Sequence, residues 1–368
     1  MKFSIEREAL LEPLQLVSNV VERRQTLPIL SNLLVVIEDD TLSLTGTDQE
    51  VELSARTSSL QCDEAGEITV PARKFLEICR SLPDAAHIKC RLKKNRLTIE
   101  SGRFISNLAT LPAIDFPNVE MAADGFAIRL PAKTLRRLLA KTSFAMAQQD
   151  VRYFFNGVLL ETEANLVRFV ATNGQRLATS FIENIETGAD AQQFILPRKG
   201  VTELARLVPD NSDLDVELKF SSNHMQAHCG QATLITKLID ATYPDYTRAI
   251  TEGGDKILQG DRVQIKEALR RTAILSNEMY RNVRLILEPG RLGMHANNPL
   301  QEEAEESVTV DYDGDSLEIG FNVGYLIDVM TAMQGEKVRM VFSDANSACL
   351  LTDPDDINSS YVISPMML

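Results

Sequence analysis

Few residues in this chain are arranged for catalysis or metal binding. The one metal-like cluster consists of His224, His228 and Cys229. This segment alternates like a strand, so the two histidines share a face, but no second ligand pair is near them. Asp48 and Glu50 could form a carboxylate pair, although acids are also common where a strand begins after a turn. We therefore predict no metal, no cofactor and no catalytic residue.

The motifs that mark nucleotide-binding and hydrolytic enzymes are also missing. The sequence contains no G-x-x-x-x-G-K-[ST], G-x-G-x-x-G or G-x-S-x-G motif. One enzyme hypothesis stays open at this point, namely a hydrolase or transferase made of duplicated domains with its site at a seam. The lack of a nucleophile, metal or phosphate loop counts against it.

Composition points to an ordinary globular protein of two or three domains. The chain has 368 residues, of which 44% are hydrophobic and 24% charged. No apolar run is long enough for a membrane span. The N-terminus carries Glu6, Glu8 and Glu12 where a signal peptide needs an apolar core. Five scattered cysteines indicate reduced thiols, so we expect a cytoplasmic protein.

The chain repeats one pattern three times. A strand-like run ends in a turn at Thr47-Asp48, at Thr172-Asn173 and at Asn297-Asn298, and successive turns are 125 residues apart. A strand–turn–helix segment follows each turn, at 68–84, 194–210 and 319–335. A period this long indicates whole domains and not solenoid repeats.

Each repeat is expected to be an α+β domain with two helices and antiparallel sheets. The predicted domains span 1–124, 125–251 and 252–368. In each, one amphipathic helix comes early and the second lies in the strand–turn–helix segment. The early helices are expected within 6–20, 131–143 and 262–273. Between them, turns such as Asp39-Asp40 and Pro289-Gly290 predict hairpins.

Taken for the whole chain, the net charge of −14 argues against a nucleic-acid ligand. However, six windows that cover the predicted helices have a net charge of +7, which leaves −21 for the rest of the chain. These windows are 6–22, 72–82, 131–143, 197–208, 262–273 and 322–334. Lys and Arg are also common on helix faces exposed to solvent. Two interpretations of this charge therefore remain, namely an ordinary solvated face and a face that binds a polyanion. The second hypothesis predicts contacts to phosphate that ignore base sequence.

The whole chain resembles the DNA polymerase III β subunits, the bacterial sliding clamps. The matching stretches include MKFSIERE, TLPILSNLL, LSLTGTDQE, ITVPARKFLEICRSLP, TLPAIDFPN, SFAMAQQDVRY, NGVLLETE, LPRKGV, PDYTR, RRTAILSNE, EEAEE, EIGFNVGYLIDV and YVISPMML. The resemblance implies a head-to-tail homodimer whose three clamp domains per chain form a ring around double-stranded DNA. It also implies a processivity factor that tethers DNA polymerase III, the clamp loader, other polymerases and repair proteins through short peptides.

The resemblance assigns residues to two surfaces of such a ring. DNA-contacting positions are Arg24, Arg73, Gln149, Tyr153 and Lys199, and Phe154 stands where the family often has Tyr. Dimer-contact positions are Lys74 and Leu108 in the first domain, and Ile274 and Leu275 in the third. Ser106 stands where an aromatic residue is expected.

The resemblance also implies a pocket between the second and third domains that takes a peptide with a Gln and apolar residues. Its matching positions are Phe155, Thr172, Gly174, Gln175, Arg176, Leu177, Pro244, Arg248, Val362, Ser364, Pro365, Met366, Met367 and Leu368. Gln175 replaces the usual His, Ser364 the usual Met and Met367 the usual Arg. An accessory or drug-resistance clamp paralogue with other partners is the alternative that this resemblance leaves open.

Overall fold

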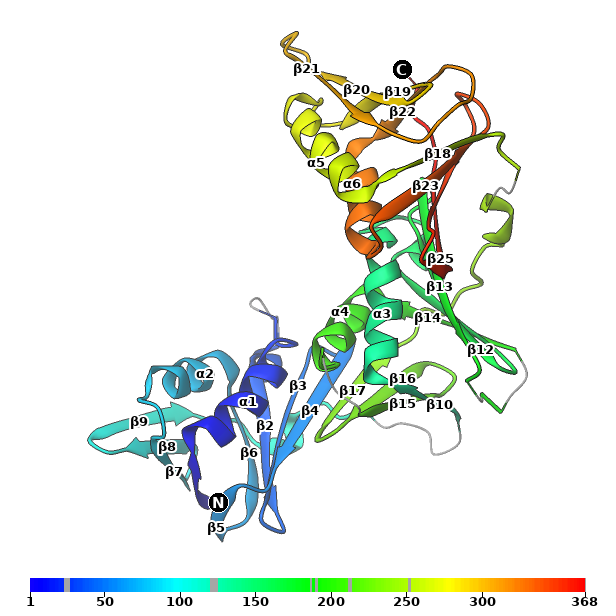
Figure 1. Cartoon of the computed structure of the whole chain (residues 1–368). Coiled ribbons are helices and arrows are strands. Elements are labelled where there is room, and N and C mark those ends of the chain that lie inside the picture. The colour runs from blue at the N-terminus through cyan, green and yellow to red at the C-terminus, as the bar shows by residue number, and fades with distance from the viewer. Residues whose placement is uncertain are drawn as a thin grey trace. The chain divides into compact units, whose positions relative to one another are not determined.

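The computed structural model describes residues 1–22, 27–119, 125–185, 187–188, 191–210, 214–250 and 253–367. In these ranges, helices and antiparallel sheets are combined, as the α+β prediction required (Figure 1). The helices are α1 (Arg7–Ser18), α2 (Ala72–Ser81), α3 (Ala132–Thr142), α4 (Arg198–Leu207), α5 (Arg262–Thr272) and α6 (Val323–Ala332). Each lies where the periodicity predicted a helix.

By internal packing the chain divides into two compact units. Unit 1 comprises Met1–Arg136 and Lys199–Leu238, and unit 2 comprises Arg137–Arg198 and Ile239–Leu368. The division passes through α3 and through the first residue of α4, so the middle repeat contributes to both units. The two boundaries between the three predicted domains therefore differ from the boundaries of these two packing units.

Unit 1 contains two antiparallel sheets. The first has the order β5-β1-β7-β8-β9. Its strands are β1 (Lys2–Glu6), β5 (Leu60–Glu64), β7 (His87–Lys93), β8 (Arg96–Ser101) and β9 (Phe104–Ala109). The second has the order β10-β15-β16-β17-β4-β3-β2-β6. Its strands are β2 (Asn32–Glu38), β3 (Thr41–Thr47), β4 (Val51–Thr57), β6 (Gly66–Pro71), β10 (Phe126–Pro131), β15 (Asp215–Phe220), β16 (His224–Cys229) and β17 (Ala232–Lys237).

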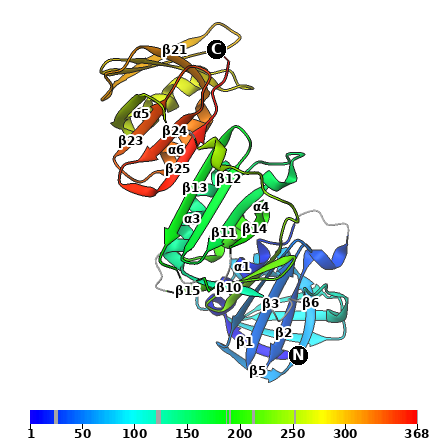
Figure 2. The same cartoon turned by 90° about the vertical axis from the view of Figure 1, so that its right-hand side faces the viewer.

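Unit 2 repeats this arrangement with an eight-stranded and a four-stranded sheet. The larger one has the order β14-β11-β12-β13-β25-β24-β23-β18, and Figure 2 shows β12 and β13 side by side in it. Its strands are β11 (Gly157–Glu163), β12 (Leu166–Thr172), β13 (Arg176–Glu183), β14 (Gln192–Pro197), β18 (Lys256–Asp261), β23 (Lys337–Phe342), β24 (Cys349–Asp353) and β25 (Asp356–Ile363). The smaller sheet, β21-β20-β19-β22, consists of β19 (Asn282–Glu288), β20 (Arg291–Asn297), β21 (Glu303–Thr309) and β22 (Leu317–Asn322).

The predicted hairpins form where the turn residues indicated. Asp39 and Asp40 join β2 to β3 with φ angles of 47° and 55°. Two successive positive φ angles give a turn whose twist matches that of the strands, and aspartate tolerates this conformation. Gly290, with a φ of 75°, turns β19 into β20.

Helix α1 shows how the helices are held on the sheets. It buries Leu10, Leu14 and Val17, which share one helical face, against β3, β4 and α2. The helix approaches β3 at Gly46, where a Cβ atom would lie 2.6 Å from the carbonyl oxygen of Val17. The glycine is therefore required by close packing of helix and strand.

The repeated turn is closed in the same way, by one Asx side chain, in all three repeats. One side-chain oxygen of Asp48, Asn173 and Asn298 accepts two backbone N–H groups from the following residues, at 2.8–3.1 Å. In the first two turns, the donors lie two and three residues further on. In the third they lie two and four residues further on, so that turn is one residue longer. Asx turns of this kind satisfy backbone groups that no strand partner reaches.

An arginine joins the two helices of each repeat. Arg7 on α1, Arg136 on α3 and Arg262 on α5 donate to carbonyl oxygens in the last turn of α2, α4 and α6 or up to three residues beyond the helix, at 2.6–3.4 Å. The last carbonyls of a helix have no partner within the helix, and a cation there also interacts favourably with the helix dipole. These arginines therefore fix the helix pairs.

Replacement of Arg262 should destabilise unit 2. In the wild-type protein, Arg262 donates to the carbonyl oxygens of Met330 and Gly335 at 2.8 and 2.6 Å. Arg262→Ala removes both donors. We expect the free energy of unfolding in urea to fall by about 1–3 kcal/mol. The matched control is Arg270→Ala on the same helix, because Arg270 is exposed and pairs with Glu267. Equal losses in the two variants would contradict the capping role.

A buried carboxyl group occupies the core of unit 1. Glu52 on β4 is 7% exposed, and its Oε2 atom has no hydrogen-bond partner. Burial raises its pKa to about 7, partly offset by a hydrogen bond from the backbone of Val119. Glu52 lies 125 residues before Leu177, so the first repeat has a carboxyl group where the second has an apolar side chain.

The raised pKa of Glu52 makes stability depend on pH. The folded protein binds the proton more tightly than the unfolded chain, so this contribution is fully present below about pH 4.5 and is lost as pH rises through about 7. Glu52→Gln should therefore gain stability relative to wild type over this range, by up to about 3 kcal/mol. Urea denaturation at a series of pH values measures the difference. Glu67→Gln, an exposed change on β6, should show no such trend.

Candidate functional site

Part of the predicted peptide pocket lies on one apolar cluster of unit 2. Phe155, Leu177 and Val362 are buried together with Tyr243 and Tyr246. Leu177 on β13 is directly opposite Val362 on β25 in the sheet register. The cluster exists because two strands distant in sequence pair and place apolar side chains on the same face.

The remaining predicted pocket residues lie around this cluster or along the last strand. Pro244 and Arg248 are exposed, and Arg248 pairs with Asp245 at 3.0 Å. The backbone N–H of Ser364 donates to the carbonyl oxygen of Gln175 at 2.8 Å. In the same C-terminal stretch, the backbone N–H of Met366 donates to the carbonyl oxygen of Gly320. Pro365 is partly exposed, and Met367 is 98% exposed. Leu368 lies outside the described residues.

Arg176 is the most constrained charged residue of the predicted pocket. Its guanidinium binds the Asp328 carboxylate at 2.5 Å and donates to the carbonyl oxygen of Phe144. It also lies over two rings, 4.5 Å from the ring centre of Tyr325 and 5.3 Å from that of Phe144. The charge is thus compensated by a carboxylate and two aromatic faces, which hold the side chain in one orientation.

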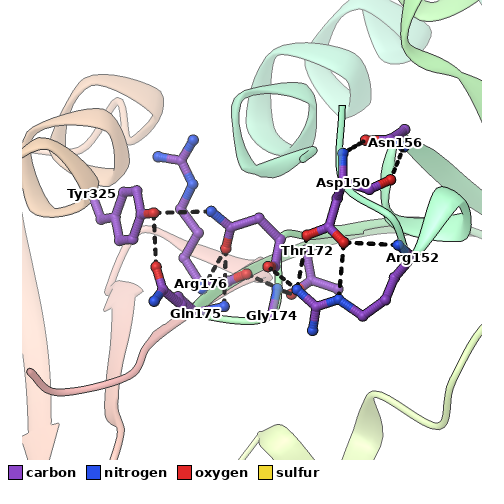
Figure 3. Close-up of polar contacts among 9 residues, drawn as sticks. Asp150, Arg152, Asn156, Thr172, Gly174, Gln175, Arg176 and Tyr325 are labelled. Atoms are coloured by element: carbon purple, nitrogen blue, oxygen red, sulfur yellow. Dashed lines mark hydrogen bonds and ion pairs between the residues drawn. The ribbon is translucent and has the colours of Figure 1, made fainter. Parts of the chain in front are cut away.

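Tyr325 of α6 connects that helix to the second repeated turn (Figure 3). Its hydroxyl accepts a hydrogen bond from the Asn173 side chain at 3.1 Å and donates to the Gln175 side chain at 3.0 Å. Thr172 closes the same turn by donating to the Arg176 carbonyl at 2.6 Å. The turn is therefore held both internally and by α6.

The loop before β11 adds a second set of contacts, also drawn in Figure 3. Arg152 donates to the Asp150 carboxylate at 3.0 and 2.8 Å and to the Asn173 carbonyl at 3.2 Å. Hydrogen bonds from Arg152 lower the pKa of Asp150 to about 2. Gly174 has a φ of 87°, and a Cβ atom there would lie 2.8 Å from the Arg152 guanidinium. The positive φ favours glycine at this position, whereas the flexible Arg152 side chain could move away from a Cβ atom.

These side chains border an open pocket of about 740 Å³. Its lining residues are Phe144, Met146, Ala147, Gln148, Gln149, Asp150, Arg152, Asn173, Gly174, Gln175, Arg176, Arg198 and Tyr325. Gly174, Gln175 and Arg176 were predicted pocket residues, and Gln149 was predicted for DNA. Sequence reasoning missed Tyr325 and Arg152, although Tyr325 lies within the third strand–turn–helix segment.

The predicted DNA-contacting residues differ in how free they are. Arg73 is 75% exposed on its side chain and pairs with Glu77 at 2.8 Å. Tyr153 is 55% exposed, and Gln149 is exposed with a φ of 56°. Lys199, in contrast, is bound by two carboxylates in unit 1. Arg24 lies outside the described residues.

The helix charge is only partly available to a ligand. Arg136 and Arg262 cap helices, and Lys141 is 2% exposed on its side chain, where it pairs with Asp356 at 3.2 Å. By contrast, Lys74 and Lys133 are exposed. Counting charge by helix therefore overestimates the basic surface, because it does not distinguish cations that neutralise internal groups.

Of the predicted dimer residues, Leu108 lies on an edge strand, Lys74 lies on α2, and Ile274 and Leu275 follow α5. β9 is the edge of the five-stranded sheet, where Leu108 is buried and the neighbouring Ile105 is 64% exposed. The Ser106 hydroxyl on this strand is buried without a hydrogen-bond partner. In unit 2, β21 is the edge of the four-stranded sheet. After α5 of that unit, Ile274 is 76% exposed and Leu275 is partly exposed.

The described residues offer little for metal or thiol chemistry. Among them, no three His, Cys, Asp or Glu side chains are close enough together to hold a metal ion. Burial raises the pKa of the Cys79 thiol to about 12 and that of Cys349 still further. None of the helices in the described ranges has the length and apolarity that a membrane crossing requires.

Family models match nearly the whole chain. The N-terminal, central and C-terminal domains of the DNA polymerase III beta subunit match residues 1–120, 129–245 and 247–367. The beta sliding clamp of Pseudomonas putida is 52% identical over 368 residues, and that of Escherichia coli K12 is 46% identical, each over the full length of both chains.

Solved structures agree with the sequence relatives. The crystal structure of the DNA polymerase III subunit beta from Pseudomonas aeruginosa matches with a TM-score of 0.96 at 51% identity, and all of both chains is covered. A sliding clamp from the same organism bound to griselimycin matches with a TM-score of 0.95 over the same coverage. The chain therefore belongs to the DNA polymerase III beta subunit family, the beta sliding clamps.

Proposed function

We propose that this chain encircles duplex DNA as a head-to-tail homodimer and tethers the replicative polymerase and other DNA-processing proteins to it. The observation that carries the proposal is the threefold repeat of one turn and one arginine-linked helix pair in a chain that belongs to the sliding clamps over its full length. The family consists of processivity factors without catalysis, so the hypothesis of an enzyme with a seam site is dropped.

The proposed ring consists of three domains per chain, 1–124, 125–251 and 252–368. The three matched ranges and the repeated turns support this division. Six similar domains from two chains would then surround DNA, and topological linkage rather than affinity would keep the ring in place. Weak phosphate contacts from Arg24, Arg73, Gln149, Tyr153 and Lys199 are sufficient for this purpose. The scattered free cysteines support a cytoplasmic location.

We propose that the edge strand β9 of one chain meets the edge strand β21 of its partner. Unpaired edge strands have free backbone groups that a second chain can satisfy. The segment 93–104, which contains β8 and the turns on both sides of it, lies next to β9 and carries four basic side chains and one acidic one, whereas 302–306 carries four acidic ones. Exposed Ile105 and Ile274 would add apolar area to this contact. Two such contacts close a two-fold ring.

The proposed peptide site combines the apolar cluster with the polar pocket beside it. The cluster around Phe155, Leu177 and Val362 would accept apolar peptide side chains, helped by the adaptable Met366. The polar pocket at Gln175 and Arg176 offers an amide and N–H donors for the peptide's Gln. Recognition of this kind places apolar anchors in a groove and fixes their register with a few polar contacts.

Encirclement predicts that DNA topology controls retention. After loading by the cognate clamp loader, the protein should stay on closed circular DNA at moderate salt and leave after a restriction enzyme linearises the circle. Gel filtration of labelled protein with the DNA measures retention. A double variant with Ile274→Ala and Leu275→Ala should weaken the ring and lose retention even on circles. Equal retention of the wild-type protein on circular and linear DNA would exclude encirclement.

The peptide site predicts binding of a Gln-plus-apolar pentapeptide, with a preference set by Gln175. In a fluorescence-polarisation titration, wild type should bind the peptide. Gln175→His removes the side-chain amide that accepts a hydrogen bond from Tyr325. The ratio of the affinity for a peptide with Gln at the first position to that for a peptide with Ala there should therefore change by about threefold to tenfold. Gln61→His, on an exposed part of β5, is the control. Absence of peptide binding, or an unchanged ranking in Gln175→His, would contradict the proposed site.

A further inference from the structure

Lys199 is surrounded by acceptors from its own chain. Its ammonium contacts the Asp48 carboxylate, the Glu22 carboxylate at 2.8 Å and the Val20 carbonyl oxygen at 3.5 Å. Burial lowers the pKa of this lysine, but the hydrogen bonds to Asp48 and Glu22 outweigh burial, so the net shift is upward. An ammonium group has three N–H donors, and all three have acceptors here.

The two carboxylates differ in how easily they could be exchanged for another anion. The Asp48 side chain is 5% exposed, and its second oxygen closes the turn by accepting two backbone N–H groups. The Glu22 side chain is 55% exposed. An exposed ion pair contributes little and is readily replaced, whereas a buried carboxylate that also holds a turn is not. Glu22 is therefore the exchangeable partner of Lys199.

Glu22 also lies near two further basic residues, one of which, Arg73, is proposed to face DNA. It borders a cavity of about 460 Å³ together with Arg73 and Arg80. It precedes Arg24 by two residues in the sequence. A carboxylate in this position faces the same ligand as the neighbouring basic side chains, but with the opposite charge.

We infer that Glu22 is an intramolecular counter-ion that competes with DNA phosphate for Lys199 and thereby weakens the clamp's grip on DNA. The inference rests on the proposed DNA-encircling function. When phosphate approaches, it displaces Glu22 while Asp48 keeps the lysine in place. Glu22 is thus a positioning residue, since it acts on DNA through Lys199. A ring held by topology gains mobility from such a device, because the contact of Lys199 with phosphate is opposed by a carboxylate of the protein.

The test is the salt dependence of DNA binding by the full-length protein. Wild type, Glu22→Gln and Glu12→Gln are titrated onto a fluorescein-labelled linear duplex, with anisotropy as the readout, between about 50 and 200 mM salt. Glu12 is an exposed acid on α1, so its variant makes the same change in net charge at another place. Glu22→Gln should bind more tightly, and its plot of log affinity against log salt should steepen by about one, the value of one added phosphate contact. The ratio of its affinity to that of wild type should fall about threefold between the lowest and the highest salt concentration.

The double variant Glu22→Gln/Lys199→Ala separates a local from a general effect. If Glu22 acts through Lys199, the gain from Glu22→Gln disappears when Lys199 is absent. The inference is overturned if Glu22→Gln binds like wild type while Arg73→Ala binds more weakly, or if Glu12→Gln gains as much as Glu22→Gln. If Arg73→Ala and Lys199→Ala both bind like wild type, the proposed DNA-binding face is wrong and this inference falls with it. Unchanged thermal melting of Glu22→Gln establishes that the fold is intact.

Discussion

The hydrogen bonds from two backbone N–H groups to one side-chain oxygen, repeated at Asp48, Asn173 and Asn298, are the interaction on which the other features depend. Each closes the turn after a core strand, where the backbone would otherwise lack acceptors. In the first repeat, the remaining Asp48 oxygen binds Lys199. In the second, the turn orients Gln175 and Arg176 toward α6. One local solution to backbone hydrogen bonding thus places the functional side chains of both units.

The repeat, the helices and the hairpins could be predicted from sequence because their signals are local. The turn at Asp39-Asp40 and the helical spacing of Leu10, Leu14 and Val17 are examples. The family could be recognised as well, since its matching stretches cover the whole chain. The burial of Glu52 could not be predicted, because the sequence of β4 does not say which segments cover it. Its pKa is set by neighbours distant in sequence.

The predicted sites were harder to judge for the same reason. A sequence shows that Lys141 and Arg136 are basic but not that one pairs with Asp356 and the other caps α4. Partner choice depends on long-range packing, which decides whether a cation faces solvent or the protein. Likewise, the contact of Tyr325 with the second turn joins residues about 150 positions apart. Charge counting could indicate a polyanion-binding protein, but not which cations are free for that role.

The uneven charge of the two edge regions bears on self-recognition. Two copies of the segment 93–104 would bring basic side chains against basic ones, and two copies of 302–306 would bring carboxylates against carboxylates. Both like-with-like pairings are penalised, whereas the unlike pairing is favoured. A chain with this asymmetry rejects symmetric edge-to-edge stacking, the first step toward sheet-like aggregates. Correct assembly and resistance to aggregation then arise from the same few charges.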